Sequence, residues 1–295
     1  MNNVLYRKKI DFFNIINVAI MSLICLVTIY PIWYTVVNSF NDGADAMMGG
    51  IYWWPRKFSL DSYAAVFRNS GVVQAFGVAI FRTVLGTITH IFLVSMTAYV
   101  LTKTKLFGRK AILGLATFTM FFSGGLIPFF ILIRDLHLLN SLMVYVVPTM
   151  FNFFHVIIFM SFFRELPASL EESAIIDGAN EFTVFLRIIL PLSMPVLATI
   201  ALFQGVWHWN DYFFGTIYIN SPELQPISTY LYRVIAETSS ASMLNNMPAG
   251  MRTQTVTMQT IKLATMVVAT FPIVATYPFL QRYFVQGMMI GSIKG

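Results

Sequence analysis

The sequence is short of charge and of cysteine, and both shortages exclude classes of protein. Only 11% of the 295 residues are charged, whereas 57% are hydrophobic. A soluble domain carries about a quarter charged residues. Cys25 is the single cysteine, so the chain holds no disulfide framework. We therefore expect an integral membrane protein, with residues 1–295 forming a single membrane domain.

Motifs for catalysis and nucleotide binding are also missing. The chain contains no G-x-x-x-x-G-K-[ST], so it is not expected to bind ATP through a P-loop. No Cys/His pair has metal-ligand spacing and no G-x-S-x-G elbow occurs. We predict no catalytic residue, no metal and no cofactor bound by this chain, which is not expected to be an enzyme. No carboxylate lies in the interior of a predicted span, whereas proton-coupled transporters usually carry such relays.

Long apolar runs are abundant, and six of them approach the roughly 20 residues that cross a bilayer as a helix. They lie at about 12–37, 83–102, 111–133, 142–163, 191–213 and 261–281. The first exceeds the roughly 7–15-residue core of a signal peptide, so we expect an uncleaved span. The third is expected to cross kinked or unwound, because Ser123-Gly124-Gly125 and Pro128 interrupt it. The fold class expected is an all-α integral membrane protein with six transmembrane helices.

The cationic residues predict the orientation. The short loop Lys103–Lys110 carries four of them, which marks it as cytoplasmic. With six spans, both termini then lie on the cytoplasmic side of the cell membrane. Loops assigned outside also carry cations, so the bias is modest: Arg56, Lys57, Arg68, Arg134, Arg233 and Arg252. The net charge of +6 is attributed to loop residues meeting anionic membrane lipid, and no nucleic acid partner is expected.

A polar, amphipathic segment at 166–190 separates the fourth and fifth spans. Pro167 suits a first helical turn, where its missing N–H costs nothing. Asp177-Gly178 is a stop signal, because glycine adopts the left-handed conformation that ends a helix. Asn180 can then cap a second helix at 181–187. The segment is predicted to form helix, tight turn and helix, which by itself fits an ordinary cytoplasmic loop helix.

The spacing within this segment resembles the signature of bacterial ABC importer permeases, E-A-A, three residues, G, nine residues and I-x-L-P. Ser173 replaces the first alanine, and the remaining positions match in register. The resemblance implies a cytoplasmic coupling helix that docks on an ATPase, with Pro191 and Pro195 transmitting its movement into the fifth span. The coupling residues so implied are Glu171, Glu172, Ser173, Ala174, Asp177, Gly178, Ala179, Ile188, Leu190 and Pro191.

The resemblance covers nearly the whole chain and is to carbohydrate-uptake permeases of the maltose-importer class, complex-oligosaccharide branch. It is carried by stretches 54–55, 58–63, 125–128, 138–141, 177–179, 207–210 and 281–295. It implies a type I importer transmembrane domain with a core at 76–282 and one helix outside a core of five. It also implies a second homologous permease, two ATPase subunits that use ATP, an extracellular solute-binding protein and a sugar substrate moved by alternating access.

Polar residues inside the spans are candidates for the substrate pathway, since unpaired polar groups are costly in hydrocarbon. Sugars favour aromatic faces together with amides and imidazoles. The candidates are Ser123, Asn152, His155, Gln204, Trp207, Trp209 and Asn210. They could equally pack against a partner chain, and His90 is expected to form a helix–helix hydrogen bond.

The segment 214–260 is predicted to be a long extracellular loop. It is either a flexible connector or, as loops of this length often are, functional. The resemblance implies that its tip enters the sugar cleft of the binding protein, through Met243, Asn245, Asn246 and Met247. Two other classes compete with the importer: a secondary, ion-coupled sugar transporter and a membrane enzyme.

Overall fold

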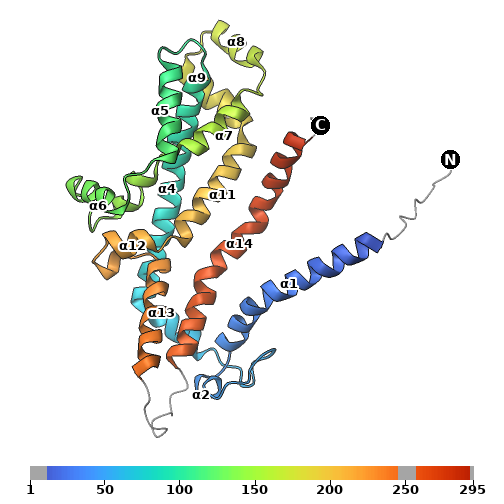
Figure 1. Ribbon diagram of the computed structural model, residues 1–295, viewed down its shortest axis with the longest axis vertical. Helices are drawn as coiled ribbons and strands as arrows, with labels where there is room; N and C mark the ends of the chain where they lie inside the picture. Colours follow the sequence, from blue (N-terminus) through green and yellow to red (C-terminus); the bar gives the residue numbers. More distant parts are fainter. Residues whose placement is uncertain (1–11, 245–256, 293–295) are drawn as a thin grey trace, which may run out of the picture. The chain divides into compact units, whose positions relative to one another are not determined.

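The computed structural model describes residues 12–244 and 257–292, and it folds them into helices and connecting turns with one isolated β-bridge, Asn41 to Phe58 (Figure 1). The described residues belong to two compact units, one from 1–68 and 237–268, the other from 69–236 and 269–295. The prediction of a single domain with a core at 76–282 stays a prediction. An all-α fold is confirmed.

The first unit contains α1 (Phe12–Ser39), α2 (Gly43–Ala46) and α3 (Asp61–Arg68), with the end of α13 (Ile227–Leu244) and the start of α14 (Met258–Ser292). Most of α1 is exposed, and its buried residues begin at Val37. The polar stretch after α1 is folded around Asp45, which accepts from Asn41 (2.9 Å) and pairs with Arg56 (3.0 Å). The pKa of Asp45 is lowered, mainly by the hydrogen bond from Asn41 and then by the contact with Arg56.

The second unit is built on α4 (Ser70–Thr102), which packs against α7 (Phe153–Phe163) and α11 (Met194–Asn210). Its core is apolar and fully buried, with Val94, Ala98, Phe159 and Ile200 all at 0% exposure. The remaining elements are α5 (Arg109–Phe121), α6 (Leu126–Asp135), η1 (Leu142–Tyr145), η2 (Val147–Thr149), α8 (Ala168–Ile176), α9 (Glu181–Val184), the π-turn η3 (Phe185–Ile189), α10 (Leu190–Leu192), α12 (Phe213–Tyr218) and η4 (Pro222–Leu224). Within this unit α5, α8 and α9 gather at one end, and α6 and α12 lie away from them (Figure 1).

Among the described residues, three helices are long and apolar enough to cross a membrane, and three bent helix pairs bring the number to six if each pair is one span. The predicted break in the third span is confirmed, since α5 and α6 meet at 116° and Gly125 has φ +84°. The predicted fourth and fifth spans are also bent helix pairs, and no break was predicted for either. They bend by 50° and 81°, the latter at Ser193, between Pro191 and Pro195. Prolines remove helix hydrogen bonds, which explains the second bend.

Two further expectations need correction. The second span begins at Ser70 and contains Arg82, whereas the apolar run was started at residue 83. Of the predicted loop 214–260, residues 214–244 are largely helical: they contain most of α12, η4 and the 18-residue α13. Tyr218 of α12 and Ile227 of α13 are both buried.

Candidate functional site

The segment 166–190 folds as the predicted helix, tight turn and helix. Helix α8 ends at Ile176 with Asp177 as its C-cap, and Gly178 has φ +85°, the left-handed conformation that favours glycine. The Asn180 side chain accepts from Thr183 N at 2.8 Å and caps α9, as predicted. Two details were wrong: Pro167 is the N-cap of α8, not a residue of its first turn, and the second helix passes into a π-turn at Phe185.

Helix α8 has no buried residue, although its sequence is half apolar. Ile176 is 85% exposed, and Leu170 and Ile175 are exposed as well. Glu172, Ser173, Asp177 and Gly178 are also exposed. Exposed isoleucines next to exposed acidic residues form a surface suited to contact with another protein.

The opposite side of the segment packs on the core of the second unit. Ala174, Ala179, Ile188 and Leu190 lie against the buried cluster that contains Val184, Phe185 and Ile189. Pro191 is exposed and follows directly in α10. The predicted coupling residues therefore divide into an exposed set on α8 and its turn and a half-buried set that joins the segment to α11.

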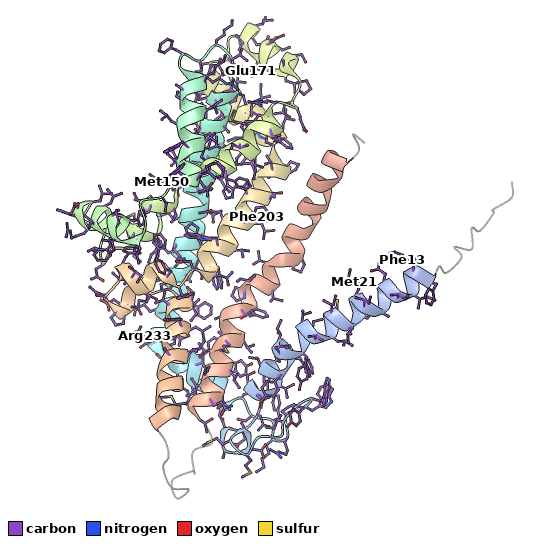
Figure 2. All side chains as sticks on the ribbon, viewed as in Figure 1. Phe13, Met21, Met150, Glu171, Phe203 and Arg233 are labelled. Atoms are coloured by element: carbon purple, nitrogen blue, oxygen red, sulfur yellow. The ribbon has the colours of Figure 1, made fainter. Side chains whose placement is uncertain are left out.

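Glu171 differs from its neighbour Glu172, because it forms an ion pair with Lys103. Figure 2 shows Glu171 at the α8 end of the second unit, opposite to Arg233 of α13. Lys103 also pairs with Glu181 at 3.0 Å. The two acids at the start of the signature thus face different surroundings.

A buried polar cluster runs between α4 and α11. His90 Nε2 lies 2.8 Å from His155 Nδ1, and His90 Nδ1 lies 3.0 Å from the Thr149 carbonyl oxygen. The expected helix–helix hydrogen bond of His90 is confirmed. Gln204 Nε2 donates to the same carbonyl at 3.4 Å and lies 3.2 Å from His208 Nε2. Two of the predicted pathway residues, His155 and Gln204, are therefore brought together.

The cluster continues into an ion pair that sequence reasoning missed. Arg82 Nη2 lies 2.9 Å from Asp211 Oδ2, and the side chains are 1% and 10% exposed. The guanidinium also lies 4.8 Å from the centroid of the Tyr145 ring. Arg82 Nε and Nη1 have no hydrogen-bond partner. One signal could have found this pair: an arginine next to an apolar run points to an acid partner, because charges inside membrane segments pair with one another.

The other predicted pathway residues are not brought together. Ser123 is exposed in the break between α5 and α6, and Asn152 is exposed and caps α7 through Phe154 N. The indole N–H of Trp209 donates to the Ala269 carbonyl at 2.9 Å. Trp207 contacts the His208 ring, and Asn210 bonds within its own helix. The pathway assignment stays a prediction.

The predicted binding-protein residues lie at the edge of the described chain. The backbone of Met243 belongs to α13, whereas Asn245, Asn246 and Met247 lie outside the described residues. Over residues 12–244 and 257–292, no group of three or more His, Cys, Asp or Glu side chains could hold a metal ion.

Broken apolar spans, a buried polar cluster and an exposed helix that mixes apolar and acidic residues indicate a multi-span membrane protein. The chain belongs to the family described as "Binding-protein-dependent transport system inner membrane component", whose profile matches residues 10–290. Its fold is that of a type I ABC importer permease.

Individual relatives span nearly the full chain. "Protein LplC" of Bacillus subtilis is 40% identical over 288 residues, covering 96% of this chain and 95% of that protein. "Polygalacturonan/rhamnogalacturonan transport system permease protein YtcP" of the same organism is 37% identical over 284 residues, covering 96% and 98%. A chain of a solved bacterial ABC transporter "involved in the import of the acidic polysaccharide alginate" is 30% identical, with a TM-score of 0.85 and coverage of 95% and 99%. The predicted family is confirmed.

Proposed function

We propose that this chain is a permease subunit that imports an oligosaccharide by alternating access, driven by an ATPase that docks on α8. The observation that carries the proposal is the exposed α8, with Ile176 bare and Gly178 in a left-handed turn, in a chain of this family. Relatives named for polygalacturonan and alginate transport support an oligosaccharide as substrate. The chain itself has a transport role and performs no chemistry.

The partners proposed are a second homologous permease, two ATPase subunits and an extracellular solute-binding protein. The family description supports the last of these, since its members serve binding-protein-dependent systems. ATP is bound by the ATPase and no cofactor by this chain, which lacks a P-loop. The apolar exposed face of α1 is proposed to meet lipid or a partner, and both termini are proposed to be cytoplasmic.

The proposed function is tested by uptake of labelled oligogalacturonides and alginate oligosaccharides into cells that express the complete transporter. Glu172→Lys and Gly178→Arg should abolish uptake and release the ATPase subunits while the chain stays inserted, because both positions are exposed and lie outside the apolar spans. Glu165→Lys, an exposed acid before α8, is the matched control and should leave uptake intact. Normal uptake and retained ATPase subunits in either α8 variant would contradict the docking role.

The orientation is tested by cysteine accessibility in a Cys25→Ser background. A membrane-impermeant thiol reagent applied to intact cells should label cysteines placed at Asn140 and Ser242 and spare those at Gly108 and Ser173. Labelling at Ser173 would place α8 outside and overturn the coupling assignment.

The buried cluster favours one alternative function, ion-coupled sugar transport, because ionisable residues inside a bundle are typical of proton relays. His90, His155 and Arg82 are such residues. Uptake into vesicles separates the two functions: dependence on ATP and on added ATPase subunits supports the importer, whereas dependence on a proton gradient alone supports the alternative.

A further inference from the structure

Lys103 makes an unusual number of contacts for a loop residue. It follows the last residue of α4, and its ammonium group forms ion pairs with Glu171 of α8 and Glu181 of α9. It also donates to the Tyr99 hydroxyl at 2.9 Å and lies 4.2 Å from the centroid of the Tyr99 ring. One cation thus joins the end of α4 to both helices of the segment 166–190.

The pair between Lys103 and Glu171 is more shielded from solvent than an ordinary surface ion pair, whereas the Glu181 side chain is 62% exposed. The side chains of Lys103 and Glu171 are 27% and 26% exposed, so solvent screens their pairing less than it screens exposed charges. Tyr99 donates to Glu181 at 2.7 Å, which orients the second carboxylate toward the same ammonium. The three hydrogens of an ammonium group match three acceptors.

The rest of the α4–α5 loop is also held in place. Arg109 Nε donates to the Leu101 carbonyl at 2.7 Å, so the chain on both sides of Lys103 is bound to the end of α4. Lys105, two residues further on, is exposed and forms no ion pair within the described chain. The loop therefore presents one cation inward and another to solvent.

We propose that Lys103 is a positioning residue that makes α4 move together with α8 when the ATPase drives the transport cycle. This inference rests on the proposed docking of the ATPase on α8. Glu171 is the internal contact and the exposed Glu172 faces the partner. Movement of α8 then reaches α4 through Lys103 as well as α11 through Pro191.

The direct connection to α4 matters because of what that helix carries. Arg82, Gly86 and His90 lie four residues apart on its buried face. Arg82 pairs with Asp211, Gly86 lies against the His208 ring, and His90 bonds to His155. A displacement of α4 along its axis therefore moves the cluster relative to α11. The link through Lys103 gives the ATPase a second route to the interior of the bundle.

The test measures the distance between α4 and α8 directly. Nitroxide labels are placed at Val100 of α4 and Ser169 of α8, both exposed, in a Cys25→Ser background. The complex purified with its ATPase subunits is compared without nucleotide and after trapping with ATP and vanadate. In the parent chain the interspin distance should be the same in both states, because the two helices move as one body.

Removing the ammonium group should separate the helices. In Lys103→Met a longer distance, present in the parent only as a minor population, should become roughly five-fold more populated, as expected for losing a partly exposed charge network. Lys103→Arg should retain the parent distance, and Lys105→Met is the matched control that should change nothing. Glu171→Gln, which removes the contact from the α8 side alone, should reproduce the effect if Lys103→Met fails to fold.

Two results would overturn the proposal: a distance that changes on trapping in the parent chain, or parent-like distances in both Lys103→Met and Glu171→Gln. Failure of the proposed function is seen separately. If Glu172→Lys keeps its ATPase subunits, the docking role of α8 is wrong, while the nucleotide-free distance still reports whether Lys103 holds α8 to α4.

Discussion

Helix α8 and the buried face of α4 both carry charged or ionisable side chains among apolar ones, but these side chains have opposite surroundings. On α8 no residue is buried, Glu172 is exposed, and Ile176 is 85% exposed beside it. On α4 the side chains of Arg82 and His90 are 1% and 0% exposed and bond to residues of the same unit. The polar groups of α8 are left exposed, whereas those of Arg82 and His90 are bonded largely within the chain.

Because the two surfaces differ in burial, mutations in them are expected to affect different properties: stability on α4 and partner binding on α8. A buried charge left without its partner costs several kcal/mol, whereas an exposed residue contributes little to stability. Changes in the polar cluster should therefore reduce the free energy of unfolding, and changes on α8 should reduce partner binding with stability unchanged. The predictions below test this separation, beginning with the largest expected loss of stability.

Asp211→Ala should give the largest loss, about 3–5 kcal/mol, because it leaves the guanidinium of Arg82 buried and unpaired. The carboxylate also accepts from Phe213 N at 3.2 Å, a bond that would be lost. The measurement is unfolding of the detergent-solubilised protein followed by fluorescence. The matched control is Asp135→Ala, whose pair with Arg134 is more than half exposed and should contribute at most about 1 kcal/mol. Equal losses in the two variants would remove the distinction.

Gly86→Ala should cost about 1–3 kcal/mol, because the new Cβ would lie 2.3 Å from His208 Nε2 and force the imidazole away. The bond between His208 and Gln204 would be strained or lost. Gly77→Ala is the control on the same helix, since its Cβ would have no heavy atom within 4 Å. That variant should be stabilised by up to about 1 kcal/mol, and a matching destabilisation in both would contradict the close contact.

Gly178→Ala should cost about 1–2 kcal/mol, the strain of a left-handed backbone in a residue with a Cβ. No neighbour lies within 4 Å of that Cβ, so steric contact inside the chain adds nothing. Gly178→Asn should recover much of the stability, since asparagine tolerates this conformation. Thermal unfolding of the two variants side by side measures the difference, and equal midpoints would show that the turn has relaxed.

Ile176→Glu should leave the free energy of unfolding within about 0.5 kcal/mol, because the side chain is almost fully exposed. The same change should release the ATPase subunits during purification, since it puts a charge on the proposed docking surface. Phe107→Glu is the control, an exposed apolar residue of the α4–α5 loop outside the signature. A destabilised Ile176→Glu that keeps its ATPase subunits would reverse the comparison.

Local chemistry explains why the helix–turn–helix of 166–190 could be predicted. Gly178 requires no neighbour to adopt its positive φ, and Asn180 caps α9 by accepting from Thr183 N, three residues away. The apolar runs predicted the helices for the same reason, because a backbone inside hydrocarbon must bond within its own segment. The spacing of the signature, a pattern of residues rather than of contacts, was enough to identify the family.

The breaks at 150–152 and at Ser193, the helices within 213–244 and the Arg82–Asp211 pair were not predicted. The ion pair depends on a contact between residues far apart in sequence, because Arg82 and Asp211 are separated by 129 positions. The bend at Ser193 is local, since the prolines on either side of it remove helix hydrogen bonds. A search for apolar runs ends a span at a charged residue such as Arg82, because the acid that pairs with it is distant in the sequence. The sequence could likewise not distinguish Glu171 from Glu172.

By itself, then, the sequence determined the apolar helices, the turn at Gly178, the cap at Asn180 and the family, since each depends on composition or on residues within one or two helical turns. The tertiary structure alone decided that Arg82 is buried against Asp211, that His90 meets His155, and that Glu171 faces Lys103 while Glu172 faces outward. Those choices depend on which helices pack together, and the free energy of a buried charge is set by the partner that packing brings to it.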